Sequence, residues 1–304
     1  MSDIKLFRID GTQMTALESK AVDVEKRLQT LVEQNLEVTL GIRFLATEYS
    51  TGQKTRGRID SLGIDENGCP VIIEYKRDLK DNVINQGLYY LDWLMDHKGE
   101  FELLVTRQYG AKDAEAIEWS NPRLLCIARD FTKYDEHAVQ QMNRNIELIR
   151  YRHYPTGFLI LEMVNATTAN GGTSQTSPNS GGKATSYTTV TESLEKAPTA
   201  LKELFDTTQQ YLLGLGDDVQ TKTLKFYFAF KRIKNFACIE VKPQKKCLAA
   251  FVKLDPVEHP EEKGFLRDVQ NVGHFGTGNM EITIKNEDDL ERAKPLLMKS
   301  YEAS

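Results

Sequence analysis

The stretch that decides the fold runs from residue 58 to residue 76 and has the sequence RIDSLGIDENGCPVIIEYK. Residues 58–64 and 70–75 have the composition of strands. Residues 65–68 between them end in Asn-Gly, a pair that tolerates the positive φ of a hairpin turn. Residues 71–73 are a continuous apolar run, which is typical of a strand buried on both faces. The sequence therefore predicts an antiparallel hairpin whose second strand lies inside a sheet.

Three charged residues of this hairpin are predicted to meet at one place. Glu74 and Lys76 are two residues apart at the end of the second strand, so their side chains share a face. The hairpin folds the first strand, which carries Asp60, back alongside them. Burying carboxylates costs on the order of several kcal/mol unless something compensates, and a divalent cation is the natural compensation. We therefore expect Asp60 and Glu74 to hold Mg²⁺ or Mn²⁺, with waters and substrate phosphate completing the shell. Lys76 is then placed to hold the attacking water and to offset phosphate charge, which predicts phosphodiester hydrolysis.

At these residues the chain resembles the PD-(D/E)XK nuclease superfamily. Its D…(D/E)-x-K signature is matched by Asp60 and by Glu74-Tyr75-Lys76, with Ile59 where the usual proline stands. On the next predicted helix, Gln86 and Tyr90 are similar to the Q-x-x-x-Y motif of the RecB-like branch. The resemblance covers roughly residues 22–165.

A second part of the resemblance lies upstream, where residues 31–37 (LVEQNLE) are similar to the first helix of the NucS-like (EndoMS) nuclease domain. There a glutamate points at the metal, and Glu33 matches it. The resemblance implies a restriction-endonuclease-like α/β fold and catalytic roles for Asp60, Glu74, Lys76 and Gln86. It also implies substrate contact for Tyr90 and metal contact for Glu33.

The implied activity is that of a Mg²⁺- or Mn²⁺-dependent endonuclease of the repair or defence type, with DNA favoured over RNA as the substrate. A homodimer remains open, because cleavage of two strands often needs one. The alternatives are a non-catalytic nucleic-acid-binding protein or an adaptor that retains the nuclease fold. In those cases Glu74 and Lys76 would be an ordinary pair on a solvated face, Glu33 a surface acid, and Gln86 with Tyr90 a packing pair.

Around the hairpin, hydrophobic periodicity predicts a helix, three consecutive strands and then alternating helices and strands. This order is typical of an α/β sandwich around a mixed sheet flanked by helices. Besides the hairpin, strands are predicted at 4–8, 44–49, 101–106, 123–128, 146–151 and 157–164, and helices at 16–36, 81–96, 111–120 and 136–145.

Residues 165–190 are almost wholly Gly, Ser, Thr, Asn, Ala and Pro, with Lys183 as the one charge. Such a segment cannot bury enough apolar surface to offset its ordering entropy, which predicts a flexible linker. It separates a nuclease-like domain (1–164) from a small α+β accessory domain (191–304). In the accessory domain, helices are predicted at 193–213 and 287–301, and strands at 224–231, 237–241, 248–254, 264–268 and 280–284. This half resembles a small domain of unknown function appended to such nuclease domains, which implies coupling to the nuclease and no separate chemistry.

Charge is segregated along the chain, although its formal net charge is −5. Residues 222–253 hold many lysines and arginines, opposed only by Glu240 and interleaved with aromatic residues, a mixture that suits nucleic-acid contact. The alternative is that the rings form a core and the lysines a solvated face. In the accessory domain, phosphate contacts are predicted for Lys231, Arg232 and Lys234. Around the hairpin they are predicted for Arg56, Arg58 and Arg77. For this second set, a solvated loop without phosphate contact is an equal alternative.

The remaining composition predicts a cytoplasmic protein without a membrane partner. No run approaches the roughly 20 apolar residues of a membrane-spanning helix, and residues 1–10 lack the basic-then-apolar pattern of a secretory signal. The four cysteines contain no CxxC pair, which favours reduced, isolated thiols over a zinc site or a disulfide scaffold.

Overall fold

The structure is a computed structural model that describes residues 4–20, 25–52, 56–76, 83–167 and 188–304. The chain divides into two compact units, Met1–Gly172 and Thr173–Ser304, and each is described by itself. Most of the segment expected to be a linker lies outside the described residues. Its first residues, up to Thr167, belong to a strand, and Val190 begins a helix. Among the described ranges, no helix has the length and apolar character that crossing a membrane requires.

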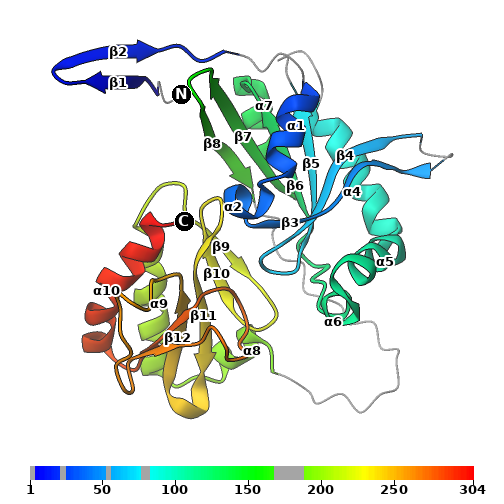
Figure 1. The fold of residues 1–304 in the computed structure, drawn as a ribbon. Helices are drawn as coiled ribbons and strands as arrows, with labels where there is room; N and C mark the ends of the chain where they lie inside the picture. Colours follow the sequence, from blue (N-terminus) through cyan, green and yellow to red (C-terminus); the bar gives the residue numbers. More distant parts are fainter. Residues whose placement is uncertain (1–3, 21–24, 53–55, 77–82, 168–187) are drawn as a thin grey trace. The chain divides into compact units, whose positions relative to one another are not determined.

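The first unit is built on a six-stranded mixed sheet with helices packed on it (Figure 1). Its strand order is β3-β4-β5-β6-β7-β8; the pairs β5–β6 and β6–β7 are parallel, and the others are antiparallel. This confirms the predicted α/β class with a mixed sheet. The strands are β3 (Ile42–Ser50), β4 (Arg58–Asp65), β5 (Pro70–Lys76), β6 (Arg123–Ala128), β7 (Asn145–Tyr154) and β8 (Phe158–Thr167).

Helices cover both faces of this sheet. Helix α4 packs on β5 and β6, where Leu62 and Ile72 share one apolar core with its Leu91. Ser61 is the neighbour of Leu62 and therefore points to the other face, where its hydroxyl contacts α1. The helices are α1 (Glu25–Glu33), α2 (Leu36–Leu40), α4 (Val83–Asp96), α5 (Lys98–Tyr109), α6 (Ala111–Glu115) and α7 (Lys133–Gln140).

Two predicted elements of this unit are wrong. The apolar segment 101–106 was expected as a strand but lies within α5. There Phe101 and Val105 are buried while Leu103 is 49% exposed, so the burial follows a helical spacing of four. The helix expected from residue 16 is also wrong at its start. Residues Gln13–Leu17 form β2, which pairs with β1 (Leu6–Asp10) as a separate two-stranded ribbon.

The second unit is a six-stranded antiparallel sheet with helices on it, as the α+β prediction required. The strand order is β13-β14-β12-β11-β10-β9, and residues of α9 and α10 share one apolar core with this sheet. Of the strand predicted at 224–231, only residues 228–231 form a strand, and residues 224–227 form the turn that joins it to the preceding strand, with Leu224 N donating to Tyr227 O. The elements are α8 (Val190–Glu195), α9 (Thr199–Leu213), β9 (Gln220–Thr223), β10 (Phe228–Lys231), β11 (Asn235–Lys242), a 3₁₀ turn (Pro243–Lys245), β12 (Cys247–Val252), β13 (Leu266–Asp268), β14 (Met280–Ile284) and α10 (Glu287–Glu302).

Candidate active site

The β4–β5 hairpin brings Asp60 and Glu74 side by side. Because Ser61 pairs with Ile73 in the antiparallel register, the preceding Asp60 lies next to Glu74 on the same face of the sheet. Asp60 N donates to Glu74 Oε1 at 3.1 Å, and Tyr75 N donates to Asp60 Oδ2 at 2.9 Å. Each carboxylate is therefore tied to the backbone of the other strand. The backbone ladder, and not side-chain packing alone, fixes the distance between them.

Lys76 ends β5 and follows Glu74 by two residues, so it projects from the same face. Its side chain is 16% exposed, and its Nζ lies 3.8 Å from Glu25 Oε1. The three residues expected to carry the chemistry thus occur together, with Glu74 buried and with Asp60 and Lys76 partly exposed.

Glu74 is a buried carboxyl group with unused bonding capacity. Its exposed fraction is 0%, and its Oε2 has no hydrogen-bond partner among the described residues. Burial, and after it the charge of Asp60, raises the pKa of Glu74 to about 9. Burial also raises the pKa of Asp60, against the hydrogen bond from Tyr75 N. Ionising both carboxyl groups in the folded state costs free energy unless a nearby positive charge compensates them.

The donor set at this point fits a divalent cation that prefers oxygen. Asp60 and Glu74 supply carboxylates, and Glu74 Oε2 is the unpartnered atom such an ion would take up. No group of three or more His, Cys, Asp or Glu suited to a metal occurs in the part of the chain that the structure describes. An ion at this position would be coordinated by two carboxylates, and water and substrate would supply its other ligands, as is common for Mg²⁺.

Glu25 is a third acidic residue near this pair, and the sequence analysis did not identify it. Besides burial, which is the main cause, its charge helps to raise the pKa values of Asp60 and Glu74. Glu25, Gln29 and Glu33 are spaced four apart on α1 and therefore lie along one side of the helix. That spacing within the helix predicted at 16–36 was the available signal for Glu25.

Glu33 takes part in a different contact from the one expected. Its Oε1 accepts from Ser61 Oγ at 2.6 Å and from Gln29 Nε2 at 2.9 Å, on the face of β4 opposite to the Asp60 side chain. Gln29 Nε2 also donates to the carbonyl of Asp60 at 2.6 Å. The structure therefore places Glu33 as support for Gln29, which holds the backbone of β4, and does not bring it beside Glu74.

Gln86 and Tyr90 meet on α4 as expected, but they hold the entry to β4. Gln86 Nε2 donates to Tyr90 Oη at 3.2 Å, and the same hydroxyl accepts from Arg58 N at 3.1 Å. The Tyr90 ring also packs against Gly57, where an added Cβ would come within 2.5 Å of it. Tyr90 is 6% exposed, so its contacts fix the strand two residues before Asp60.

We expect Tyr90→Phe to lower the free energy of unfolding of the first unit by about 1–2 kcal/mol, because the partly buried Arg58 N–H loses its acceptor. Denaturant unfolding followed by tryptophan fluorescence measures this change, since both tryptophans, Trp93 and Trp119, belong to this unit. Tyr89→Phe is the matched control: that side chain is 53% exposed, and we expect a change below about 0.5 kcal/mol. Equal effects of the two substitutions would contradict the role assigned to Tyr90.

Two of the three basic residues expected to contact phosphate in the first unit, Arg56 and Arg58, precede Asp60 in the chain. Arg56 is exposed, with a left-handed backbone (φ 49°), in the connection that leads into β4. Arg58 begins β4; its side chain is 68% exposed and forms an ion pair with Glu48. Arg77 lies outside the described residues. Phosphate contact by Arg56 and Arg58 stays a prediction.

The basic stretch of the second unit is less exposed than its sequence suggested. Lys231 is 1% exposed, because it belongs to β10, an interior strand whose four residues are all buried. Arg232 Nε lies 2.7 Å from Asp218 Oδ2, and its guanidinium stacks on the Tyr301 ring. Lys234 is partly buried. A surface role for Lys231 in binding nucleic acid is thus inconsistent with its position, and the nearby rings are core, which is the alternative interpretation (Phe228, Phe230, Phe236 and Phe251).

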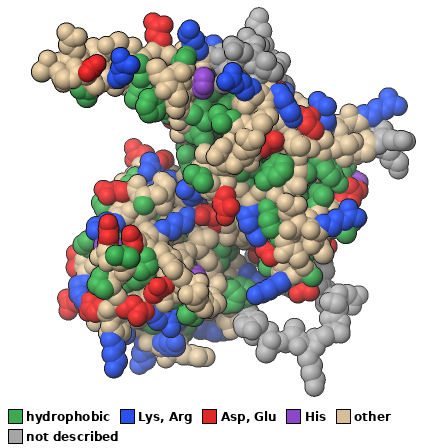
Figure 2. All heavy atoms as spheres, viewed as in Figure 1, with side chains coloured by type: hydrophobic (Ala, Val, Ile, Leu, Met, Phe, Trp, Pro, Cys, Tyr) green, Lys and Arg blue, Asp and Glu red, His purple; other side chains and the backbone are tan. Residues whose placement is uncertain are grey.

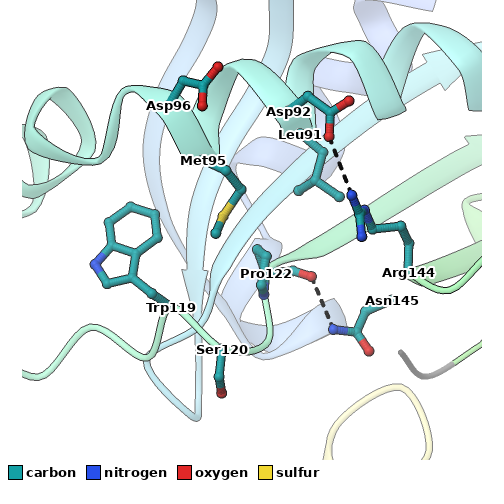
Figure 3. Close-up of a pocket in the computed structure, with 9 residues that line it drawn as sticks. All are labelled: Leu91, Asp92, Met95, Asp96, Trp119, Ser120, Pro122, Arg144 and Asn145. Carbon is teal, nitrogen blue, oxygen red and sulfur yellow. Dashed lines mark hydrogen bonds and ion pairs between the residues drawn. The ribbon is translucent and has the colours of Figure 1, made fainter. Parts of the chain in front are cut away.

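A pocket of about 530 Å³ lies elsewhere in the first unit, between the end of α4 and the starts of β6 and β7 (Figure 3). Met95 and Trp119 line it together with Arg144, whose guanidinium lies 3.6 Å from Asp92. Because β5 and β6 run parallel, the start of β6 lies at the opposite end of the sheet from Lys76. None of the residues expected to carry the chemistry lines this pocket.

This chain is similar to one family model, to a bacterial protein and to two solved structures. A family model described as a domain of unknown function (DUF5655) matches residues 190–304. A protein of Haemophilus influenzae (strain ATCC 51907 / DSM 11121 / KW20 / Rd), described as an uncharacterized protein, is 28% identical over 308 residues, covering 97% of this chain and 98% of that protein.

Two solved structures are also similar to this chain. A repair endonuclease from Pyrococcus abyssi is 18% identical, with a TM-score of 0.29, over 44% of this chain and 50% of that one. A chain from the structure of an EndoMS–dsDNA2 complex is likewise 18% identical, with a TM-score of 0.26, over 47% of this chain and 49% of its own. The matched region thus spans about half the length of each solved chain.

Proposed function

We propose that this chain is a metal-dependent nuclease that hydrolyses phosphodiester bonds, with DNA as the favoured substrate. The observation that carries the proposal is the buried Glu74 carboxyl, whose Oε2 lacks a partner among the described residues while Asp60 lies hydrogen-bonded beside it. A carboxyl group buried beside a second carboxylate destabilises a fold unless positive charge compensates it, so this arrangement favours a cation-binding site over a purely structural one.

In this proposal Asp60 and Glu74 hold a Mg²⁺ or Mn²⁺ ion, which when bound supplies charge stabilisation for the phosphodiester. Lys76, half-buried beside them, positions the attacking water and offsets charge on the reacting phosphate. Glu25 orients the Lys76 side chain through its ion pair. Gln29 and Tyr90 hold the backbone of β4 on either side of Asp60. Arg56 and Arg58 are exposed where a phosphate backbone would approach.

The test is a panel of labelled single-stranded, duplex, branched and mismatched DNA and RNA, incubated with Mg²⁺, Mn²⁺ or chelator. We expect metal-dependent cutting of at least one DNA substrate, and its loss in Asp60→Ala and Lys76→Ala prepared in parallel. Binding of the panel without cutting by the wild type, in either metal, would favour the non-catalytic alternative. Cutting by purified Asp60→Ala at the wild-type rate would contradict the proposal.

The raised pKa of Glu74 predicts how stability depends on pH in the absence of metal. A carboxyl with a folded-state pKa of about 9 binds its proton more tightly when folded, so the wild type loses stability as pH rises from about 4.5 through about 9. Glu74→Gln removes this titration. In chelator at pH 8 we expect the variant to melt about 5 °C or more above the wild type, with the gap closing toward pH 5.

The control for this prediction is the same pair of melts in excess Mg²⁺ or Mn²⁺. Metal should raise the melting temperature of the wild type at pH 8, because it binds the ionised folded state, and should leave Glu74→Gln nearly unchanged. If Glu74→Gln instead melts below the wild type in chelator at pH 8, ionisation of the buried Glu74 carboxyl does not lower the stability of the folded state.

A further inference from the structure

Basic side chains line up across the first sheet one step beyond the two carboxylates. Lys76 pairs with Ala128 of β6, and Ala128 pairs with Arg150 of β7, in the parallel register of these strands. The antiparallel register of β4 and β5, continued to the start of β4, places Arg58 opposite Lys76. Because directly paired residues share a face, Arg58, Lys76 and Arg150 form one basic row on the face of the two carboxylates.

This row lies at the edge of the sheet where β5 and β6 end and β4 begins. Lys and Arg side chains (blue) occur along the upper edge of the first unit in Figure 2, where the β7–β8 hairpin turns in Figure 1. Neighbouring strands are about 4.8 Å apart, so β4 and β7 are separated by roughly 14 Å. A polyanion that crosses the strands at this edge would therefore meet positive charge on both sides of Lys76.

The two arginines of β7 on this face differ in what they contact. The Arg150 side chain is 4% exposed, and its guanidinium forms ion pairs with Asp130 and Glu162. Arg152 follows two residues later, so it lies on the same face one step nearer to the end of the strand, and it is partly exposed. Arg150 is therefore committed to holding the fold, and Arg152 is the cation of β7 that a ligand at this edge can reach.

Arg152 has bonding capacity that the described residues do not use. Its Nε is buried and has no hydrogen-bond partner among them. Turning the guanidinium toward a ligand therefore breaks no hydrogen bond of Nε, and a new acceptor there would remove the cost of leaving a buried N–H unpaired. A planar guanidinium suits two oxygens of one phosphate group. The chemistry of this side chain thus matches a phosphate of a nucleic-acid backbone.

We propose that Arg152 binds a phosphate of the substrate strand, on the opposite side of the reacting phosphate from Arg58. The substrate backbone crosses the sheet edge from β4 to β7, with Lys76 at the reacting phosphate. Ala128, the residue between Lys76 and β7 in this row, is small and leaves room for the strand. The inference rests on the proposed nuclease function for the position of the reacting phosphate, whereas phosphate binding by Arg152 is measurable without cleavage.

Binding of labelled single-stranded and duplex DNA, in Ca²⁺ and again in chelator, tests the role of Arg152. We expect Arg152→Gln to weaken binding about tenfold and to reduce the slope of log K against log salt concentration by about one, because one phosphate contact is lost. Arg152→Lys keeps the charge and should keep the wild-type slope. Arg144→Gln is the matched control: it makes the same change next to the other end of β7 and should alter neither affinity nor slope.

A methylphosphonate scan, which neutralises one phosphate of the oligonucleotide at a time, locates the contact. The wild type should bind less tightly when the phosphate held by Arg152 is neutral, and Arg152→Gln should be insensitive at that position. We expect Arg152→Gln to melt within about 2 °C of the wild type, because Nε loses no hydrogen bond to the described residues.

Wild-type affinity and slope in Arg152→Gln would overturn the inference, as would equal losses in Arg144→Gln or a wild type that binds none of these oligonucleotides. The proposed nuclease activity fails separately. If the wild type binds and Arg152→Gln shows the expected losses, but neither Mg²⁺ nor Mn²⁺ supports cutting, the phosphate contact stands and the nuclease proposal does not.

Discussion

Replacing Glu74 with glutamine is expected to slow metal-dependent phosphodiester cleavage by at least about 10³-fold, while nucleic-acid binding changes by less than about threefold. Glutamine keeps the volume of the side chain and an oxygen that accepts from Asp60 N, so the hairpin retains its geometry. The change removes one negative charge from the site that would hold the ion. Stabilisation of transition-state charge at such sites contributes several kcal/mol, and about 4 kcal/mol corresponds to roughly 10³-fold in rate.

Single-turnover cleavage, with enzyme in excess over a labelled substrate, measures this effect apart from product release. Glu33→Gln is the matched control, because it makes the same chemical change on the opposite face of β4, where Glu33 accepts from Ser61 and Gln29. We expect that control to lose less than about tenfold. Wild-type rates in Glu74→Gln would remove Glu74 from the mechanism, and equal losses in both variants would mean that the metal site extends across the strand.

The part of the site that could be predicted is the part set by local rules. Gly68 adopts a φ of 76° in the turn, and the period of two along β5 aligns Glu74 with Lys76. The turn folds β4 back, and the register then fixes Asp60 beside Glu74. Each of these steps involves neighbours within about 20 residues, so the sequence pattern contained all the information needed to derive them.

The part that could not be predicted depends on contacts between distant segments. Glu25 approaches Lys76 only because α1 packs across β4 and β5, and nothing local to residue 25 reveals that packing. The segment 101–106 has an apolar content that suits a strand as well as a helix, and its packing beside α4 decides for the helix. The charge of Lys231 predicts a position at the surface, whereas its burial follows from the pairing of β10 with β9 and β11 on either side.

Arg123→Ala is expected to lower the free energy of unfolding of the first unit by about 3–5 kcal/mol. Arg123 begins β6 and is 3% exposed. Its Nη1 donates to Asp65 Oδ2 at 2.8 Å, and its Nε and Nη2 donate to the two carboxylate oxygens of Glu147 at 2.8 and 2.7 Å. Burial works to lower the pKa of Arg123, but the charges of Glu147 and Asp65 outweigh it and raise that pKa, so the group stays ionised. Removing the guanidinium takes this counter-charge away from the two buried carboxylates.

Urea unfolding followed by tryptophan fluorescence reports this loss for the first unit, since Trp93 and Trp119 both lie in it. Arg144→Ala is the matched control, because the Arg144 side chain is 55% exposed and its ion pair with Asp92 spans 3.6 Å. Exposed pairs of this kind contribute at most about 1 kcal/mol. A loss below about 1 kcal/mol in Arg123→Ala would mean that water or a rearranged side chain replaces the guanidinium.

A double variant separates the two contributions to that loss. Arg123→Met with Glu147→Leu removes the bidentate pair together, so only Asp65 remains charged, and Asp65 still accepts from Asn67 N and Cys69 N of the hairpin turn. If the destabilisation comes mainly from uncompensated charge, the double variant should be more stable than Arg123→Met alone by about 1 kcal/mol or more. If it comes mainly from lost anchoring of the turn, the double variant should be the less stable of the two. The first outcome is expected, because the turn keeps its own hydrogen bonds to Asp65 when Arg123 and Glu147 are replaced.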